Sequence, residues 1–340
     1  MPIALDATYS LGRNPSGVAV YSQEILRGLA RAHPEERFLW YFRPHRFLRS
    51  FQTALPRNAS RKILRGAQKA QVFHALNQRV DEAGANRRTV ATFHDLFVMT
   101  SEYSSKEFRE RFSEQARRAA ERSDLIVAVS RFTAGQVEEL LGVESSRIRV
   151  IPHGTRAPLH ISPAREDLVL MVGAVQKRKN VARLVKAFEQ MPVGWKLALA
   201  GSARGYGAAE ELRAVEESPR RRDIDVLGYV PEDALEDLYG RARILAFPSL
   251  DEGFGMPVLD AMARGVPVVS SRRSAIPEVA GDAALLVDPE DTEELASALN
   301  RLAGDEALRQ DLARKGRERA AEFTWESAVE RTWAVYQELR

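Results

Sequence analysis

Short apolar segments alternate with longer amphipathic segments along the whole chain, and this alternation constrains the fold more than any other feature. The apolar segments have the length of buried strands, roughly 4–8 residues, and the amphipathic ones have helical periodicity. Strands that alternate with helices in this way pair into parallel sheets with helices on both faces. In the first half of the chain, strands are predicted at 2–7, 37–42, 72–76, 89–96, 125–130 and 147–154, with helices at 20–32 and before Gly142.

The same alternation begins again after residue 167. The segment 153–167 contains prolines and few apolar residues, so it is predicted to be a linker. Further strands are predicted at 168–175, 196–202, 223–230, 244–249, 267–271 and 283–288, with helices at 181–190, 233–240, 256–264 and from 293 onward. A length of 340 residues suits two domains of roughly 150 residues each. We therefore predict an α/β chain with two doubly wound, Rossmann-like domains, residues 1–158 and 159–322, that face each other across a cleft.

Composition excludes several classes of protein. The chain has no cysteine, which rules out a disulfide scaffold, a thiolate nucleophile and a cysteine-ligated zinc site. No apolar run approaches the ~18 residues of a membrane span. The N-terminal residues MPIALDA contain neither a basic leader nor an apolar signal core, so we expect a cytoplasmic protein.

Charge is divided unevenly along the chain. Residues 1–160 carry 25 Lys and Arg against 16 Asp and Glu, whereas the remaining residues carry 25 against 31. Within 43–79 there are nine basic residues and no acidic one. This stretch is either a solvated surface or a contact for a polyanionic ligand or for an anionic membrane, which would place the protein peripherally at the inner face of that membrane. Nucleic acid is not expected as a partner, because no zinc finger, RNP-like strand or helix-turn-helix is found.

The segment 249–271 contains the clearest candidate for a binding site. Glycines at 253 and 255 precede a predicted helix that begins near Pro257 and ends at Gly265. Free backbone N–H groups at a helix N-terminus bind anions, phosphate above all. Glu252 and Asp260 flank this turn; either carboxylate alone could simply favour the helix dipole, but the pair also suits the hydroxyl groups of a nucleotide sugar.

These residues carry a family resemblance. EGFGMPVLDAMARGVPVV resembles the Glu-x7-Glu signature of retaining glycosyltransferases of the GT-B fold, in the group 1 or family 4 class. The resemblance extends over nearly the whole chain, through LDATYSLGRNPSGVAVYSQEILRGLA, TFHDL, SDLIVAVSRFTAGQV, RIRVIPHG, VGAVQKRKNVARLVKAF and IPEVAGDAALLVDP. Two positions depart from the pattern: the second acidic residue is Asp260 rather than Glu, and Ala174 stands where many relatives have Arg.

The resemblance implies that the two domains bind different substrates. It makes residues 1–158 the acceptor-side domain, residues 159–322 the donor-binding domain, and 323–340 a C-terminal helix that crosses back to pack on the N-terminal domain. Lys179 and Arg178 would neutralise the donor diphosphate, Glu252 would bind hydroxyl groups of the donor sugar, and Asp260 would bind the ribose. The other donor-site residues that the resemblance implies are Gly17, Gly201, Ser202, Val230, Gly253, Phe254, Gly255 and Met256.

In the N-terminal domain, Gly12 and Gly17 enclose a loop that leads into a helix, but no Lys-Ser/Thr follows, so a P-loop is excluded. A single histidine after a strand more often has a structural role. The resemblance nevertheless makes His94 a catalytic residue beside the reacting carbon, together with Lys179 and Glu252, and places Asp95 on the acceptor side, where it either orients His94 or caps the next segment.

Two other sites are rejected. Asp223 and Asp225 imitate a metal-binding Asp-x-Asp motif, but they open a predicted strand. The histidines lack zinc-ligand spacing, so no metal is predicted. Glu252 and Asp260 could also suggest a glycosidase pair, but a glycosidase would leave the phosphate-binding features unexplained.

The sequence therefore predicts a retaining, metal-independent hexosyltransferase of polysaccharide biosynthesis. Its co-substrate is a nucleotide diphosphate sugar, with GDP-mannose favoured over a UDP-sugar because of the Arg-Lys-Asn variant, and its acceptor is a glycan, a lipid-linked sugar or a small molecule. The alternative is a non-catalytic GT-B subunit that binds glycans or assists assembly. A Rossmann epimerase is disfavoured because Gly-x-Gly-x-x-Gly and Tyr-x-x-x-Lys are missing.

Overall fold

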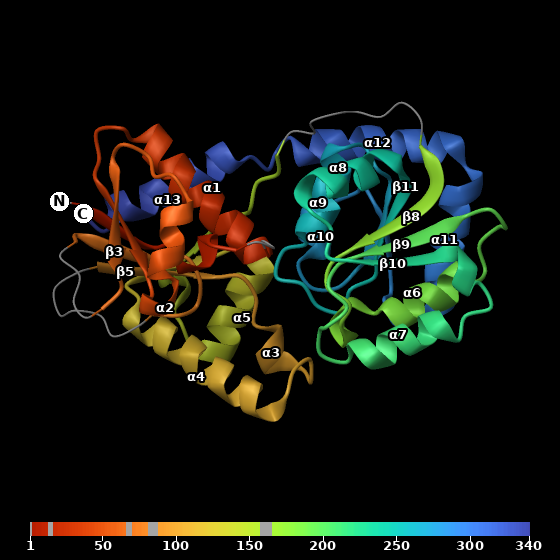
Figure 1. Cartoon of the computed structure of the whole chain (residues 1–340), viewed down its shortest axis with the longest axis horizontal. Coiled ribbons are helices and arrows are strands. Elements are labelled where there is room, and N and C mark those ends of the chain that lie inside the picture. Colours follow the sequence, from red (N-terminus) through yellow and green to blue (C-terminus); the bar gives the residue numbers. More distant parts are fainter. Residues whose placement is uncertain (1, 13–15, 66–69, 81–87, 157–164) are drawn as a thin grey trace. The chain divides into compact units, whose positions relative to one another are not determined.

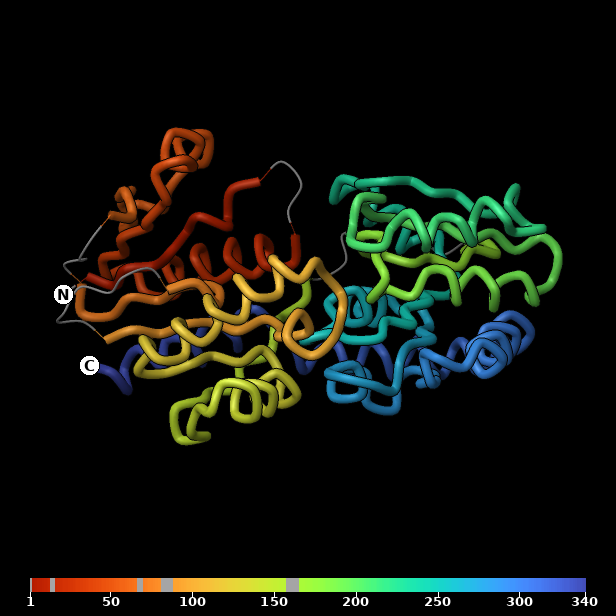
Figure 2. Tube along the Cα trace, turned by 90° about the horizontal axis from the view of Figure 1, so that it is seen from below, coloured from red at the N-terminus to blue at the C-terminus, as the bar shows by residue number. Residues whose placement is uncertain are grey.

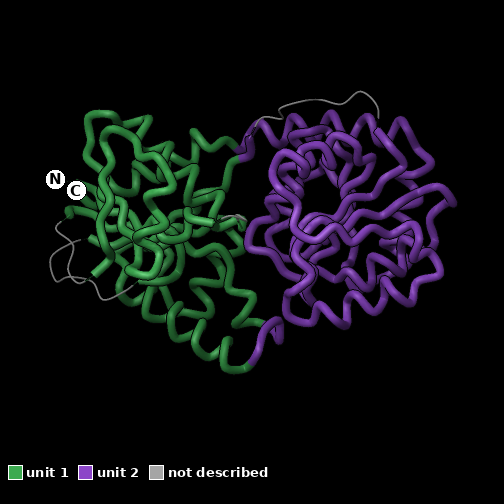
Figure 3. The backbone as a smooth tube through the Cα atoms, viewed as in Figure 1, with its two compact units in different colours: residues 1–100, 106–154, 324–340 green, residues 101–105, 155–323 purple. Residues whose placement is uncertain are grey.

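The chain divides into two compact units in the computed structural model, which describes residues 2–12, 16–65, 70–80, 88–156 and 165–340. Unit 1 comprises residues 1–100, 106–154 and 324–340, and unit 2 comprises residues 101–105 and 155–323 (Figure 3). The predicted domain boundary at 158/159, the middle of the loop between Gly12 and Gly17, and residues 66–69 of the basic stretch lie outside the described residues.

Unit 1 contains a seven-stranded parallel sheet in the order β3-β2-β1-β4-β5-β6-β7. The central strands are almost completely buried because helices cover both faces, whereas the edge strand β3 has the sequence ASRKI and is only partly buried. This polar composition explains why no strand is predicted there. The strands are β1 (Ile3–Asp6), β2 (Phe38–Phe42), β3 (Ala59–Ile63), β4 (Val72–Ala75), β5 (Arg88–Phe93), β6 (Leu125–Ala128) and β7 (Ile148–Val150).

The helices of unit 1 form two layers. Helix α1 pairs with α13, and α4 packs against α3 and α5 (Figure 1). Helix α5 begins after the Ser130 side-chain cap and ends at Gly142, whose φ of 65° suits glycine, in agreement with the prediction. The helices are α1 (Gly17–Ala32), α2 (Pro44–Phe47), α3 (Phe97–Thr100), α4 (Lys106–Arg122), α5 (Arg131–Leu141) and α13 (Trp325–Glu338).

The C-terminal helix α13 is part of unit 1, as the fold prediction requires. Val329 fits against Gly28 of α1, where a Cβ atom would lie only 2.4 Å from Val329 Cγ2. The Tyr336 hydroxyl hydrogen-bonds with His74 Nδ1 of β4 at 2.6 Å. In both views the start of β1 and the end of α13 lie at the same end of this unit (Figures 1 and 2). Both ends of the chain therefore contribute to one core.

Unit 2 contains a six-stranded parallel sheet in the order β10-β9-β8-β11-β12-β13. Its strands are β8 (Glu166–Val172), β9 (Lys196–Ala200), β10 (Ile224–Gly228), β11 (Ala242–Phe247), β12 (Val268–Ser271) and β13 (Leu285–Val287). Each sheet thus has the 3-2-1-4-5-6 order of a doubly wound Rossmann fold, and the predicted fold class is confirmed.

The helices of unit 2 also form two layers. Helices α6, α7 and α11 pack together, and α9 packs with α10 and α12 (Figure 1). They are α6 (Val181–Phe188), α7 (Ala208–Glu216), α8 (Glu232–Arg241), α9 (Met256–Ala263), α10 (Ile276–Ala280), α11 (Thr292–Gly304) and α12 (Glu306–Ala320). In unit 2 the strand order reverses between β8 and β11, and ligands of such sheets bind beyond the carboxyl ends of the strands at this switch point.

Candidate active site

Two loops leave the sheet of unit 2 at its switch point. The first follows β8 and contains a short 3-10 helix, η4 (Lys177–Lys179). The second follows β11 and continues through Glu252 to the start of α9. Because β8 and β11 are neighbouring parallel strands, both loops begin at the same edge of the sheet. The backbone N–H of Leu250 donates to the Arg178 carbonyl at 2.8 Å and ties one loop to the other.

A buried cluster of two cations and one carboxylate joins these loops. Lys179 Nζ lies 2.5 Å from Glu252 Oε1, and Arg178 Nη1 lies 2.7 Å from the same oxygen. All three residues are more than nine-tenths buried. Lys179 Nζ also lies 4.3 Å from the ring centroid of Phe247, at the end of β11. The structure thus brings together the three donor-site residues predicted to carry charge near the diphosphate and the sugar.

The cations keep the carboxylate ionised. Burial alone would raise the pKa of Glu252, but the charges of Arg178 and Lys179 and their hydrogen bonds outweigh it and lower the pKa to about 2. Glu252 is therefore an anion at neutral pH and can only accept hydrogen bonds, as binding of sugar hydroxyl groups requires. With two cations and one anion, the cluster keeps a net charge of +1, which favours an anionic ligand.

Two residues that the prediction did not single out hold these loops in place. Asn180 has a left-handed backbone, with φ of 60°, and its Nδ2 donates to the carbonyls of Pro248 at 3.1 Å and Pro289 at 2.6 Å. Ser274, also left-handed with φ of 56°, accepts a hydrogen bond from the Glu252 N–H at 3.0 Å. The role of Asn180 could have been suspected from the sequence, because asparagine tolerates a left-handed backbone better than most residues. Nothing in the sequence pointed to Ser274.

The glycine turn before α9 has the predicted form. Gly255 has φ of 102°, a conformation that favours glycine, and a Cβ atom there would also displace the end of the Ile276 side chain, whose Cδ1 would lie 2.5 Å away. Gly253 and Phe254 are buried beside Glu252. Within the described part of the chain, no hydrogen bond takes up the N–H of Gly255 or Met256. These amides are donors of the kind that bind phosphate at a helix N-terminus.

Asp260 lies apart from the charged cluster. Its Oδ1 accepts a hydrogen bond from Thr155 Oγ1 at 2.8 Å and lies 3.7 Å from Arg264 Nη1. Burial raises the pKa of Asp260, while Arg264 and Thr155 act in the opposite direction. The carboxylate remains partly exposed, with 29% of its side chain accessible. Among the described residues it therefore shares no partner with Glu252, although both flank the turn.

The remaining donor-site residues of unit 2 lie at neighbouring strand ends. Gly201 follows β9, and a Cβ atom there would lie 1.9 Å from the Gly173 carbonyl oxygen, so only glycine permits this approach of the two backbones. Ser202 is exposed, and its carbonyl accepts the Val175 N–H at 2.8 Å. Val230 is half-buried in the loop after β10. All of them lie at the carboxyl edge of the sheet.

The N-terminal candidates belong to unit 1 and are described separately. His94 follows β5 directly, and its Nε2 donates to the Leu76 carbonyl at 2.9 Å, so the neutral ring presents Nδ1 as an acceptor. Burial lowers the pKa of His94 to about 4, so it is uncharged at neutral pH. Asp95 is half-buried beside it, and Gly17 is the exposed first residue of α1.

His94 is one of three buried histidines in unit 1, with His74 and His153. Its ring stacks on His153 at 5.5 Å between centroids and meets the edge of Tyr21 at 4.8 Å. Burial lowers the pKa of His74 to about 3 and that of His153 well below its usual value. All three histidines are thus held neutral in the folded protein.

The rejected metal motif has a structural explanation. Asp223 lies in the 3-10 turn before β10, not in the strand as expected, and pairs with Arg220 at 3.0 Å, whereas Asp225 is exposed on β10. Among the described residues, no group of three or more His, Asp or Glu side chains is placed to hold a metal ion. No helix in the described ranges is both long and apolar enough to cross a bilayer.

Two parallel doubly wound units, with a buried cation and carboxylate cluster at the switch point of the second, are the architecture of the GT-B class of glycosyltransferases. The family model described as "Glycosyl transferases group 1" matches residues 159–319, and that described as "Glycosyltransferase Family 4" matches residues 15–157. The chain belongs to this group 1, family 4 glycosyltransferase family, and the predicted family is confirmed.

Relatives and solved structures agree with this assignment. The chain is 32% identical over 270 residues to the O-antigen chain mannosyltransferase B of Escherichia coli, covering 74% of this chain and 71% of that protein. It is 31% identical over 235 residues to the MMP alpha-(1->4)-mannosyltransferase of Mycolicibacterium hassiacum, covering 66% and 57%.

Among solved structures, a sucrose-phosphate synthase from Thermosynechococcus elongatus matches with a TM-score of 0.79 at 22% identity, over 100% of this chain and 99% of that one. Anabaena HepE in complex with UDP and glucose matches with a TM-score of 0.75 at 17% identity, over 99% and 100%. These likenesses support the fold.

Proposed function

We propose that the protein is a retaining, metal-independent hexosyltransferase that uses a nucleoside diphosphate sugar and transfers the hexose to a hydroxyl group of a glycan, a lipid-linked sugar or a small molecule. The observation that carries this proposal is the buried cluster of Arg178, Lys179 and Glu252 at the switch point of unit 2. Its net positive charge suits a diphosphate, and its ionised carboxylate suits sugar hydroxyl groups.

The proposed reaction needs charge stabilisation more than a strong base. As the bond from the anomeric carbon to the diphosphate breaks, negative charge grows on the departing phosphate. Arg178 and Lys179 are fixed cations that stabilise this charge, and the amides of the glycine turn add neutral donors. The acceptor oxygen then bonds to the anomeric carbon on the face that the diphosphate leaves, and its proton passes to the departing phosphate oxygen. Glu252 holds the sugar, and His94, neutral and presenting Nδ1, contributes a hydrogen-bond acceptor.

We further propose GDP-mannose as the donor. Two relatives that are about one third identical are named mannosyltransferases, which supports mannose, whereas the UDP complex of HepE shows that a neighbour of the same fold binds UDP. Asp260 is proposed to bind the ribose, with Thr155 orienting its carboxylate.

A thermal-shift panel tests the donor. GDP should raise the melting temperature more than UDP or ADP in the presence of EDTA, because a ligand that binds only the folded state stabilises it. Proton NMR of the product from GDP-mannose should show the α-anomer. A shift with UDP alone would overturn the choice of donor, an inverted product would overturn retention, and complete loss of transfer in EDTA would overturn metal independence.

Unit 1 is also proposed to contact an anionic membrane surface through the basic stretch 43–79. Leu48 and Phe51 are 83% and 62% exposed within this stretch, and the guanidinium carbon of the half-buried Arg61 lies 4.9 Å from the centre of the Phe51 ring. Exposed apolar side chains on a basic segment without acidic residues suit an interface of lipid headgroups. Sedimentation with vesicles of phosphatidylcholine and phosphatidylglycerol tests this, since Leu48→Ser/Phe51→Ser should reduce binding. Equal binding of the double variant, or no binding by the wild type, would defeat the proposal.

A further inference from the structure

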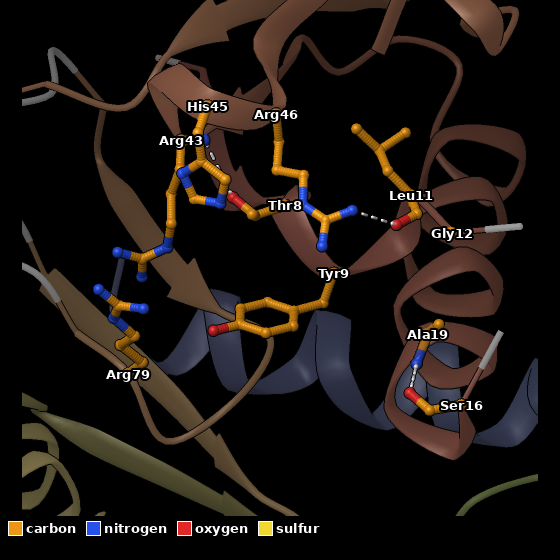
Figure 4. A pocket seen from close by; sticks show the side chains of 10 residues that line it. All are labelled: Thr8, Tyr9, Leu11, Gly12, Ser16, Ala19, Arg43, His45, Arg46 and Arg79. Atoms are coloured by element: carbon orange, nitrogen blue, oxygen red, sulfur yellow. Dashed lines mark hydrogen bonds between the residues drawn. The ribbon is translucent and has the colours of Figure 1, made fainter. Parts of the chain in front are cut away.

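A cavity of about 400 Å³ in unit 1 is lined by basic side chains (Figure 4). The lining residues that the structure describes include three arginines and one histidine but no Asp or Glu. The basic ones are Arg43, His45, Arg46 and Arg79. The volume is within the range of pockets that hold small ligands, roughly 300–1,000 Å³. We infer that this cavity binds a phosphate monoester group carried by the glycosyl acceptor, an inference that rests on the proposed function.

The position of the cavity in the fold supports a ligand site. Arg43 follows β2, Thr8 and Tyr9 follow β1, and Arg79 follows β4. Strands β2, β1 and β4 are neighbours, and the strand order of unit 1 reverses between β1 and β4. The cavity therefore lies at the carboxyl edge of the sheet at the switch point of unit 1, where doubly wound sheets bind their ligands.

The side chains present donors for an anion. The guanidinium groups of Arg43 and Arg79 point to the same side of the cavity, and Arg46 reaches in from α2 (Figure 4). Guanidinium groups present a planar fork of donors that matches phosphate oxygens. Tyr9 adds a hydroxyl group in the same view. The N-terminus of α1 also lies at the cavity, where Ser16 and Ala19 line it, and its dipole favours the same sign of ligand charge.

One of the three arginines also has a structural role. Arg43 is buried and lies 3.5 Å from the buried Asp6 carboxylate of β1, and its N–H donates to Thr8 Oγ1 at 3.1 Å. Arg46 is only half-buried, and its Nη1 donates a long hydrogen bond of 3.4 Å to the Leu11 carbonyl. Arg46 is therefore the arginine whose replacement tests ligand binding with least risk to the fold, and Arg79, which follows β4, is replaced together with it.

The shared chemistry of a phosphate monoester could come from a soluble sugar or from a lipid. The test is a calorimetric titration of the protein saturated with GDP, which occupies the proposed donor site. The soluble arm compares mannose 6-phosphate with mannose, and the lipid arm uses dihexanoyl phosphatidic acid below its micelle concentration. Binding of either phosphate, with no binding of mannose, is expected for the wild type.

A pair of double variants distinguishes phosphate binding in the cavity from a general effect of positive charge on the protein surface. Arg46→Gln/Arg79→Gln should weaken phosphate binding by about tenfold for each guanidinium removed. Arg27→Gln/Arg31→Gln removes the same charge from exposed positions on α1 that do not line the cavity, and should leave phosphate affinity within about twofold. Circular dichroism and the melting temperature of each variant check that the fold is kept.

Each outcome decides the inference. Loss of phosphate binding only in the cavity variant supports it, and the arm that responds identifies a soluble or a lipid phosphate. Equal losses in both variants, or no preference of the wild type for phosphate over mannose, would overturn it. If the wild type fails to bind GDP but binds the phosphate through Arg46 and Arg79, the donor proposal fails and the cavity assignment stands.

Discussion

Two near-isosteric substitutions in the charged cluster, Lys179→Met and Glu252→Gln, should have different effects on GDP affinity. Lys179→Met removes one of the two cations proposed to face the diphosphate. Glu252→Gln removes the carboxylate that neutralises both, at 2.5 Å from Lys179 Nζ and 2.7 Å from Arg178 Nη1. The first variant should therefore bind GDP more weakly, and the second should bind it as tightly as the wild type or more tightly.

The distances also set the expected order of stability. After Lys179→Met, Glu252 keeps its ion pair with Arg178, so the loss is that of one charge-assisted hydrogen bond, about 1.5–3 kcal/mol. After Glu252→Gln, two buried cations remain without their carboxylate, and removal of one partner of a buried pair costs about 3–5 kcal/mol. Glu252→Gln should thus be the less stable variant in the absence of ligand, and the one that GDP stabilises more.

Both variants should lose transfer, for different reasons. Lys179→Met should lower kcat by about 10²–10³, the usual cost of removing one fixed donor to a developing charge. Its GDP affinity should fall by about tenfold or more. Glu252→Gln should lower transfer while GDP affinity is kept, since the carboxylate is proposed to hold the sugar and not the phosphate.

The assays are calorimetric titration with GDP, urea unfolding, and chromatographic measurement of GDP released from GDP-mannose. Lys186→Met is the matched control, because Lys186 is exposed on α6 and pairs only at the surface with Glu189 at 3.2 Å. Wild-type GDP affinity in Lys179→Met, or a greater loss of GDP affinity in Glu252→Gln than in Lys179→Met, would refute the assignment of roles.

Three further predictions concern the scaffold. Gly201→Ala should destabilise unit 2 by about 1–3 kcal/mol or more in urea unfolding, because its Cβ would lie 1.9 Å from the Gly173 carbonyl oxygen. Tyr336→Phe should destabilise unit 1 by about 1–3 kcal/mol, because His74 Nδ1 loses its buried partner at 2.6 Å. The three buried histidines have pKa values below 6.5 in the folded protein, so as the pH falls they are protonated in the unfolded chain before they are protonated in the folded one. The melting temperature, followed by tryptophan fluorescence, should therefore fall as the pH drops from 6.5 towards 4.

Each of these predictions has its own control. Gly135→Ala lies within α5 with no atom within 4 Å of its added Cβ, so it should instead stabilise by up to about 1 kcal/mol, and equal effects at both glycines would contradict the packing argument. A Tyr336→Phe protein as stable as the wild type would show that His74 finds another partner. A melting temperature that stays constant between pH 6.5 and 5 would show that the histidines are not held neutral.

The sequence alone determined most of the strands and several of the helices along the chain, because periodicity is a local property. The break before residue 168 and the end of α5 at Gly142 were predicted from the sequence. The positions of Lys179 and Glu252 after strands were predictable too, because loops at the carboxyl ends of parallel strands gather at one edge. Helix α4 escaped prediction because it is highly charged and buries only three alanines, and β3 because it is a polar edge strand.

Only the tertiary structure decided which of these residues touch. Periodicity does not give the order of strands in a sheet, and in both units the first strand pairs with the fourth across the switch point. That pairing brings Arg178 and Lys179 to Glu252, 73 residues later, while packing gives Asp260 a separate partner in Thr155. The same pairing in unit 1 gathers Arg43, after β2, and Arg79, after β4, around one cavity. Strand pairing over long sequence separations, and the packing it imposes, decided these contacts, and no local pattern encodes them.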